Sequence, residues 1–165
     1  MVEIKTIRGE LTSETAKNIL EKYDSNIKII AVDEIYYPYT LRRYHLKLAS
    51  SFGRLSKLNR YVDCSIDMVY GRPALAQGSP FFENIYTEEE NMLRCNLSDD
   101  ALNKIGHDFV FNYYLNKSKI LRTPQITKKS EEAFYKKFYV VHCADETENK
   151  YQILLDALDG SLALL

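Results

Sequence analysis

The sequence predicts an α+β fold made of two repeated units, in each of which a helix packs on an antiparallel three-stranded meander. Three observations predict it. Two segments have the helical spacing of apolar residues, aromatic strands follow each helix, and each half closes on an Asp-x-x-x-Gly sequence. We expect a first unit over 1–78, a linker over 79–95 and a second unit over 96–165. These units either form separate domains or share one compact pseudo-symmetric domain.

The first predicted helix begins after Thr12 or Ser13, whose hydroxyl group can accept a hydrogen bond from a backbone N–H of the first turn. The second begins after Ser98. The negative charges of Asp99 and Asp100 in its first turn stabilise it by their interaction with the helix dipole. Each helix has one apolar face. The two faces consist of Ala16, Ile19, Leu20 and Tyr23, and of Leu102, Ile105 and Phe109.

Short runs of apolar and aromatic residues, bounded by turn-forming residues, predict the strands. The high tyrosine content suits such strands, because a half-buried position needs an apolar ring with a polar tip. Strands are expected over 27–32, 35–48, 61–69, 134–143 and 150–158, with hairpin connections over 51–54 and 144–149.

The Asp-x-x-x-Gly sequence occurs twice, because Asp67 and Gly71 recur at one common offset as Asp156 and Gly160. This recurrence predicts an internal duplication. We expect each aspartate to accept hydrogen bonds from the backbone of its own turn. The alternative is that Asp67 and Asp156 approach one another and act as an acid–base pair.

A helix followed by a meander whose last strand ends in Asp-x-x-x-Gly resembles the PepSY domain. In that family the closing strand reads as a hydrophobic run, then Asp, then a turn that contains Gly. Asp67 and Gly71 occupy those places in the first half, and Asp156 and Gly160 occupy them in the second. The resemblance covers both halves. It implies a PepSY-like or cystatin-like fold and a non-catalytic, inhibitory or regulatory interaction module.

Composition indicates a globular protein. Hydrophobic residues make up 45% of the 165 residues, and both Gly and Pro are scarce. The N-terminus lacks the charged and apolar regions of a signal peptide, and no apolar run approaches the ~20 residues of a membrane helix. We therefore expect a cytoplasmic protein that does not associate with membranes.

The cysteines Cys64, Cys95 and Cys143 are odd in number and far apart, which predicts reduced thiols. Cys143 is the candidate for a reactive thiol, because His142 precedes it. Neighbouring residues of a strand point to opposite faces, however, and this argues against a Cys–His pair.

No catalytic, metal or nucleotide motif is present. The histidines and cysteines lack the His-x-x-x-His and Cys-x-x-Cys spacings of zinc sites. There is no Gly-x-Ser-x-Gly sequence and no glycine-rich phosphate loop. We predict no metal, no cofactor and no catalytic residue, and an unrecognised small enzyme is the third hypothesis for the function.

The aromatic segment over 35–44 is the first candidate surface. Pro38 cannot donate to a β-ladder, so it is expected at a sheet edge, a strand start or a bulge. An edge strand with exposed tyrosines can receive a strand of a protein or peptide partner, or of a second copy. The alternative is that its rings pack against the helix of the same unit. The candidate binding residues are Tyr36, Tyr37, Tyr39, Arg42, Arg43 and Tyr44.

The segment 42–72 is the second candidate surface, because it carries seven basic residues against Asp63 and Asp67. Basic side chains interleaved with aromatic rings can hold phosphates and stack on bases, so nucleic-acid binding is the second hypothesis. The alternative is that these charges pair with acidic loops of the same molecule, such as the six acids over 83–100. The candidate residues are Arg42, Arg43, Lys47, Arg54, Lys57 and Arg60.

Overall fold

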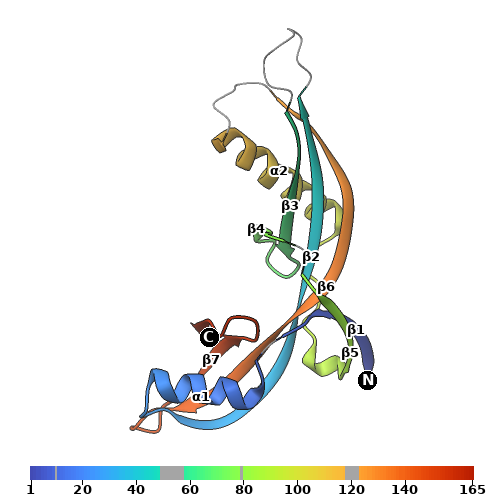
Figure 1. Ribbon diagram of the computed structural model, residues 1–165. Coiled ribbons are helices and arrows are strands. Elements are labelled where there is room, and N and C mark those ends of the chain that lie inside the picture. The colour runs from blue at the N-terminus through green and yellow to red at the C-terminus, as the bar shows by residue number, and fades with distance from the viewer. Residues whose placement is uncertain (10, 49–57, 79, 118–122) are drawn as a thin grey trace. The chain divides into compact units, whose positions relative to one another are not determined.

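A computed structural model of the chain describes residues 1–9, 11–48, 58–78, 80–117 and 123–165, and it confirms the α+β class. The described residues are mostly strand, with two α-helices (Figure 1). None of the helices in these ranges is long and apolar enough to cross a membrane. The elements are β1 (Val2–Ile7), α1 (Ser13–Tyr23), β2 (Lys28–Leu48), β3 (Leu58–Asp67), β4 (Pro73–Leu75), β5 (Phe82–Thr87), the 3-10 helix η1 (Glu89–Asn91), α2 (Asp99–Lys117), β6 (Gln125–Ala144), β7 (Lys150–Asp156) and β8 (Leu162–Leu164).

The chain forms two compact units, and each draws on both halves of the sequence. The sequence instead predicts one unit over 1–78 and another over 96–165. The strands β2 and β6 each contribute residues to both units. Unit 1 consists of Met1–Tyr37, Pro80–Leu93 and Tyr135–Leu165, and unit 2 consists of Pro38–Ser79 and Arg94–Phe134.

The core of unit 1 lies between α1 and the strands β6 and β7 (Figure 1). The helix begins as expected after Thr12, whose hydroxyl oxygen accepts a hydrogen bond from the Thr15 backbone N (3.2 Å). Ala16 and Leu20 are its buried residues. The core consists of Ala16, Leu20, Tyr139, Val141, Cys143, Ile153, Leu155 and Ala157. The helix of the first half thus covers strands of the second half.

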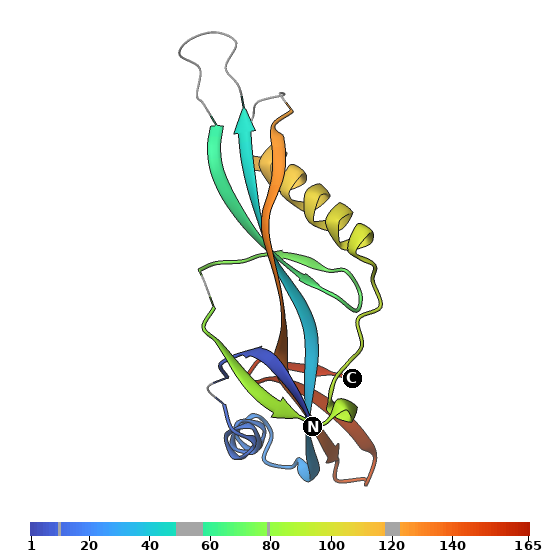
Figure 2. The same ribbon diagram turned by 90° about the vertical axis from the view of Figure 1, so that its right-hand side faces the viewer.

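The core of unit 2 has the reciprocal arrangement, because α2 from the second half packs on β2 and β3 from the first half (Figure 2). As predicted, Ser98 caps this helix, and its Oγ accepts a hydrogen bond from the Ala101 backbone N (3.3 Å). The core consists of Tyr44, Leu46, Val62, Cys64, Ile66, Leu102, Val110 and Tyr114.

The strand β2 is continuous where the sequence predicted two strands. It pairs with β3 from Tyr39, opposite Asp67, to Leu48, opposite Leu58, and its other neighbour in the sheet is β6. From Tyr39 onward β2 is therefore an interior strand. The predicted edge position of this segment is wrong for Tyr39 to Tyr44, because β3 and β6 satisfy both of its sides.

The two Asp-x-x-x-Gly turns have the same geometry. The Gly71 backbone N donates to the Asp67 carbonyl oxygen, and the Gly160 backbone N donates to the Asp156 carbonyl oxygen, both at 2.9 Å. Both glycines have positive φ, 72° and 73°. Each aspartate caps its own turn as predicted. Its carboxylate accepts hydrogen bonds from the backbone N of Val69 and Tyr70 at Asp67 (2.7 and 3.1 Å), and of Leu158 at Asp156 (2.9 Å).

The connections between the predicted strands can be followed in part. The hairpin loop over 144–149 is confirmed, because Ala144 pairs with Lys150 across it. The range 79–95, expected as a linker, contains β5, which pairs with β1. The hairpin connection predicted over 51–54 lies outside the described residues.

Candidate functional site

The three tyrosines at the start of the first candidate surface contact their own unit. Tyr36 is buried, and its hydroxyl donates a hydrogen bond to the Glu34 carboxylate (3.3 Å). The half-buried ring of Tyr37 meets Phe138 edge to face at 6.1 Å between centroids. Tyr39, also half-buried, stacks on Phe134 at 5.8 Å. The rings of Tyr37 and Tyr39 thus pack against rings of β6.

Arg42 and Tyr44 lie in the core of unit 2 instead of on its surface. Only 2% of Arg42 is exposed, and its Nη1 donates to the Asn103 side-chain oxygen at 2.6 Å. Its Nη2 lies 3.5 Å from a carboxylate oxygen of Glu131. Burial raises the pKa of Tyr44, although the nearby Arg42 charge opposes this shift. These two side chains therefore pack and pair inside unit 2 and are not exposed to a binding partner.

Arg43 points to the opposite face and makes a two-pronged ion pair with Asp63, its cross-strand neighbour. The Nε and Nη2 atoms donate to the two carboxylate oxygens, each at 2.7 Å. This pairing raises the pKa of Arg43. The charge of Arg43 is therefore compensated within the segment 42–72 itself, by a carboxylate of the neighbouring strand and not by an acidic loop.

The remaining residues of the basic surface are divided between two faces. Lys47 lies opposite Asn59 in the β2–β3 ladder, and Arg60 lies opposite Leu46. Residues opposite one another share a face, and successive residues alternate, so Lys47 and Arg60 lie on different faces. Arg54 and Lys57 lie outside the described residues. The described basic residues therefore do not form one continuous basic face.

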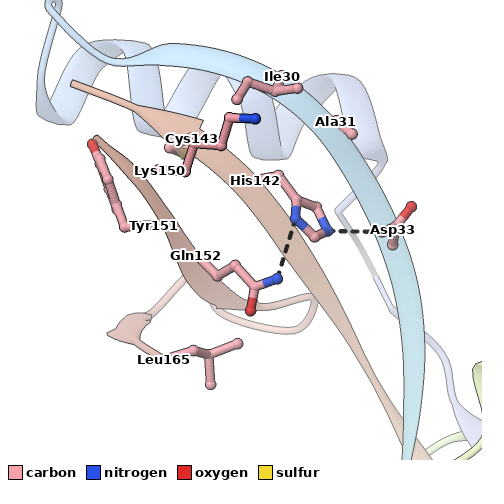
Figure 3. A pocket seen from close by; sticks show the side chains of 9 residues that line it. All are labelled: Ile30, Ala31, Asp33, His142, Cys143, Lys150, Tyr151, Gln152 and Leu165. Atoms are coloured by element: carbon pink, nitrogen blue, oxygen red, sulfur yellow. Dashed lines mark hydrogen bonds and ion pairs between the residues drawn. The ribbon is translucent and has the colours of Figure 1, made fainter. Parts of the chain in front are cut away.

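A groove on unit 1 is the strongest candidate site (Figure 3). It has a volume of about 670 Å³ and is formed by side chains of β2, β6 and β7 and by Leu165, which follows β8. This volume is within the range of roughly 300–1,000 Å³ that is typical of ligand pockets. The groove is lined by Ile30, Ala31, Asp33, His142, Cys143, Lys150, Tyr151, Gln152 and Leu165.

A chain of three polar side chains crosses the groove and joins its strands. Figure 3 shows His142 of β6 between Asp33 of β2 and Gln152 of β7. The His142 Nε2 atom lies 2.8 Å from an Asp33 carboxylate oxygen, and its Nδ1 atom lies 3.2 Å from the Gln152 amide nitrogen. In this arrangement Nε2–H donates to Asp33, and Nδ1 accepts from Gln152. Both ring nitrogens are thus engaged, and neither has a lone pair directed at a substrate.

The apolar wall of the groove is formed where the alternation of β2 is interrupted. Ile30 and Ala31 are consecutive and both exposed, while Ile29 and Val32 on either side pack against the core of unit 1. Two successive outward residues are typical of a β-bulge, and bulges are frequent next to functional sites. The interruption places Ile30, 52% exposed, and Ala31 at the groove.

The environment of the Cys143 thiol disfavours its reactive thiolate form. Cys143 is buried in the core of unit 1, and its Sγ lies 3.6 Å from the carbonyl oxygen of Val141. Burial raises its pKa, so the reactive thiolate is disfavoured. The side chain of His142 is instead bonded to Asp33 and Gln152, in agreement with the expectation that the two neighbours do not pair. No cluster of metal-ligating side chains is found in the ranges that the structure describes.

Sequence reasoning missed this groove. The sequence predicts only a short apolar strand over 27–32, and neither the spacing of the histidines nor the neighbouring Cys143 indicates that His142 bonds to Asp33 and Gln152. One signal in the sequence is the hairpin loop over 144–149, because antiparallel pairing of the strands on either side of it places His142 opposite Gln152. Asp33, the other partner of His142, lies on a strand that is distant in the sequence, so no local pattern predicts this contact.

Comparisons with known proteins add no relatives to this description. No protein-family model matches the chain, and no curated protein or solved structure matches it with significant similarity. The resemblance to PepSY domains stays a prediction.

Proposed function

We propose that this chain is a non-catalytic interaction protein that binds an extended segment of a protein or peptide partner along the groove of unit 1. The observation that carries the proposal is the chain of hydrogen bonds from Asp33 through His142 to Gln152, beside exposed apolar side chains. This combination of fixed polar groups and accessible apolar area is typical of recognition surfaces.

The groups that remain in the groove suit a peptide backbone. The bonds to His142 use one carboxylate oxygen of Asp33 and the amide nitrogen of Gln152 (Figure 3). The other Asp33 oxygen and the Gln152 amide oxygen are hydrogen-bond acceptors. An extended segment presents N–H donors at regular spacing, and its apolar side chains can cover Ile30 and Leu165.

The exposure of the walls favours a macromolecular partner over a small molecule. Ile30 is 52% and Leu165 is 63% exposed, so the walls themselves are open to solvent. Pockets for small ligands typically bury roughly 70–90% of the ligand surface, which such open walls do not achieve. A partner that fills the groove and also covers its walls buries their apolar surface, which stabilises the complex.

The proposal is tested by selecting binders from a displayed random-peptide library on the immobilised protein. We expect enriched peptides that lose at least about tenfold in affinity with Ile30→Asp, since a charge then replaces apolar contact area. The matched control is Tyr23→Asp, which alters a 77% exposed aromatic residue of unit 1 that does not line the groove. Circular dichroism verifies the fold of both variants.

Two outcomes contradict the proposal. Enriched peptides that bind Ile30→Asp as tightly as the unchanged protein place the interaction elsewhere. A library that yields no enriched peptide, together with bound lysate material that disappears on nuclease treatment, favours the nucleic-acid hypothesis. Such binding must also weaken steeply as the salt concentration rises.

We also infer that the two halves arose by duplication, as the Asp-x-x-x-Gly turns suggest. Three matches support this. The helices have equivalent caps, Thr12 and Ser98, and the turn glycines have the same φ and the same hydrogen bond. Gly71 lies close to Leu97 and Ile105, and Gly160 lies close to Leu11 and Ile19, at equivalent places relative to the two helices. In each unit the turn thus packs on the helix of the other half.

A further inference from the structure

We propose that the free edge of β5 in unit 1 is a second interaction surface, at which an extended, basic segment of a partner protein pairs as an additional strand. β5 is the terminal strand in the pairing order of the described residues, with β1 as its neighbour. An unpaired edge presents a row of backbone donors and acceptors that can pair with another chain.

The pairing with β1 determines which backbone groups of β5 point outward. The Arg8 backbone N donates to the Phe81 carbonyl oxygen at 3.0 Å, and these two residues continue the antiparallel register of β1 and β5. Hydrogen-bonded and non-hydrogen-bonded pairs alternate along an antiparallel ladder. Glu83 and Ile85 therefore direct their backbone groups toward β1. Those of Asn84 and Tyr86 point toward the free edge.

β5 lacks two of the residue types that commonly protect an edge strand from pairing with another chain. β5 reads Phe-Glu-Asn-Ile-Tyr-Thr and contains neither proline nor lysine, the residues that commonly block such edges. The aromatic side chains beside it are accessible, since Phe81 is 85% and Tyr86 is 68% exposed. Tyrosine is favoured in interfaces because its ring adds contact area and its hydroxyl stays polar.

The local charge selects the chemistry of the partner. Five exposed carboxylates lie on β1, β5 and the segment that follows β5, namely those of Glu3, Glu83, Glu88, Glu89 and Glu90. The opposing charges here are Lys5, Arg8 and the N-terminal ammonium, which lies 3.4 Å from Glu88. The acidic excess favours a segment that carries lysine or arginine and disfavours an acidic one.

The test uses a short capped peptide of alternating lysine and valine and a matched peptide of alternating glutamate and valine. Binding to the full chain is followed by isothermal titration calorimetry. We expect the lysine peptide to bind at least about tenfold more tightly than the glutamate peptide. We expect Asn84→Pro to weaken this binding at least about tenfold, because proline removes an outward N–H and leaves the ladder to β1 intact.

A control on the peptide guards against misfolding of the proline variant. N-methylation of alternate residues of the lysine peptide removes the N–H groups with which the peptide would pair. We expect it to lower the affinity for the unchanged protein about as much as Asn84→Pro lowers the affinity for the unmodified peptide. Equal binding of the lysine and glutamate peptides would overturn the proposal. So would unchanged affinity on N-methylation, which shows ionic attraction without strand pairing.

Discussion

At the scale of single residues, Gly106 of α2 lies directly against the side chain of Tyr44 of β2. A Cβ atom at position 106 would lie 2.1 Å from the Tyr44 hydroxyl oxygen and 2.9 Å from Cζ. Glycine is unfavourable inside a helix by about 1 kcal/mol relative to alanine. Its presence here is explained by packing, because only a residue without a side chain lets the tyrosine ring lie against the helix.

Gly106→Ala is therefore expected to destabilise the protein despite its better helix propensity. Overpacking costs about 1–3 kcal/mol, which outweighs the gain in propensity. The Tyr44 hydroxyl is buried without a hydrogen-bond partner among the described side chains, so Tyr44→Phe alone should be nearly neutral. The double variant should recover part of the loss, because the atom closest to the new Cβ is gone. Urea unfolding of the four proteins measures this coupling, and strictly additive effects would contradict it.

The thiols provide a second test at this scale. Burial raises the pKa of Cys64 to about 12 and also raises that of Cys143, whereas Cys95 is exposed. At pH 8 we expect a thiol-specific reagent such as DTNB to modify Cys95 rapidly and the other two slowly. All three should react at once in denaturant. Rapid reaction of a second thiol in the native protein would show that one of the cores is open.

At the scale of elements, each Asp-x-x-x-Gly turn packs against the helix that covers the strands of its hairpin. Both turn glycines have positive φ, and both lie against one apolar residue just before a helix and another in the second turn of that helix. The turn thus fixes the backbone and also contacts the core, so its glycine is required for two separate reasons. The two reasons can be separated by comparing glycines that all have positive φ but differ in the room available for a Cβ atom.

Alanine at three glycines with positive φ should give a graded loss of stability. At Gly78 (φ 79°) nothing lies within 4 Å, so only the backbone penalty of about 1–2 kcal/mol applies. At Gly160 a Cβ would meet Ile19 at 3.1 Å, and at Gly71 it would meet Ile105 at 2.8 Å. We expect Gly71→Ala to cost most and Gly78→Ala least. Thermal unfolding checks this order, and equal losses at all three would refute the contact contribution.

At the scale of the whole molecule, neither unit can be assembled from one half of the sequence. The core of unit 1 takes Ala16 and Leu20 from the first half, while its other buried residues come from β6, β7 and the turn after β7. Unit 2 reverses these contributions. The stability of each unit therefore depends on both halves of the chain, because each helix buries its apolar face on strands of the other half.

Separate expression of the two halves tests this dependence. We expect fragment 1–78 and fragment 79–165 each to lack the cooperative unfolding of the full chain and to regain it when mixed, because each supplies the helix that covers the strands of the other. The measurement is thermal unfolding followed by circular dichroism. A fragment that unfolds cooperatively as a monomer would show that its helix can cover its own strands.

Local sequence patterns predicted the α+β class, both helices with their caps, the hairpin loop over 144–149 and the two aspartate turns. All of these depend on contacts within a few residues, which local patterns encode. Three features follow from the folded structure and not from local patterns: which helix covers which strands, the interior position of β2 at Tyr39 to Tyr44, and the burial of Arg42. So does the contact between Asp33 and His142. Such contacts join residues far apart in the chain, and their free energy comes from packing that no local pattern records.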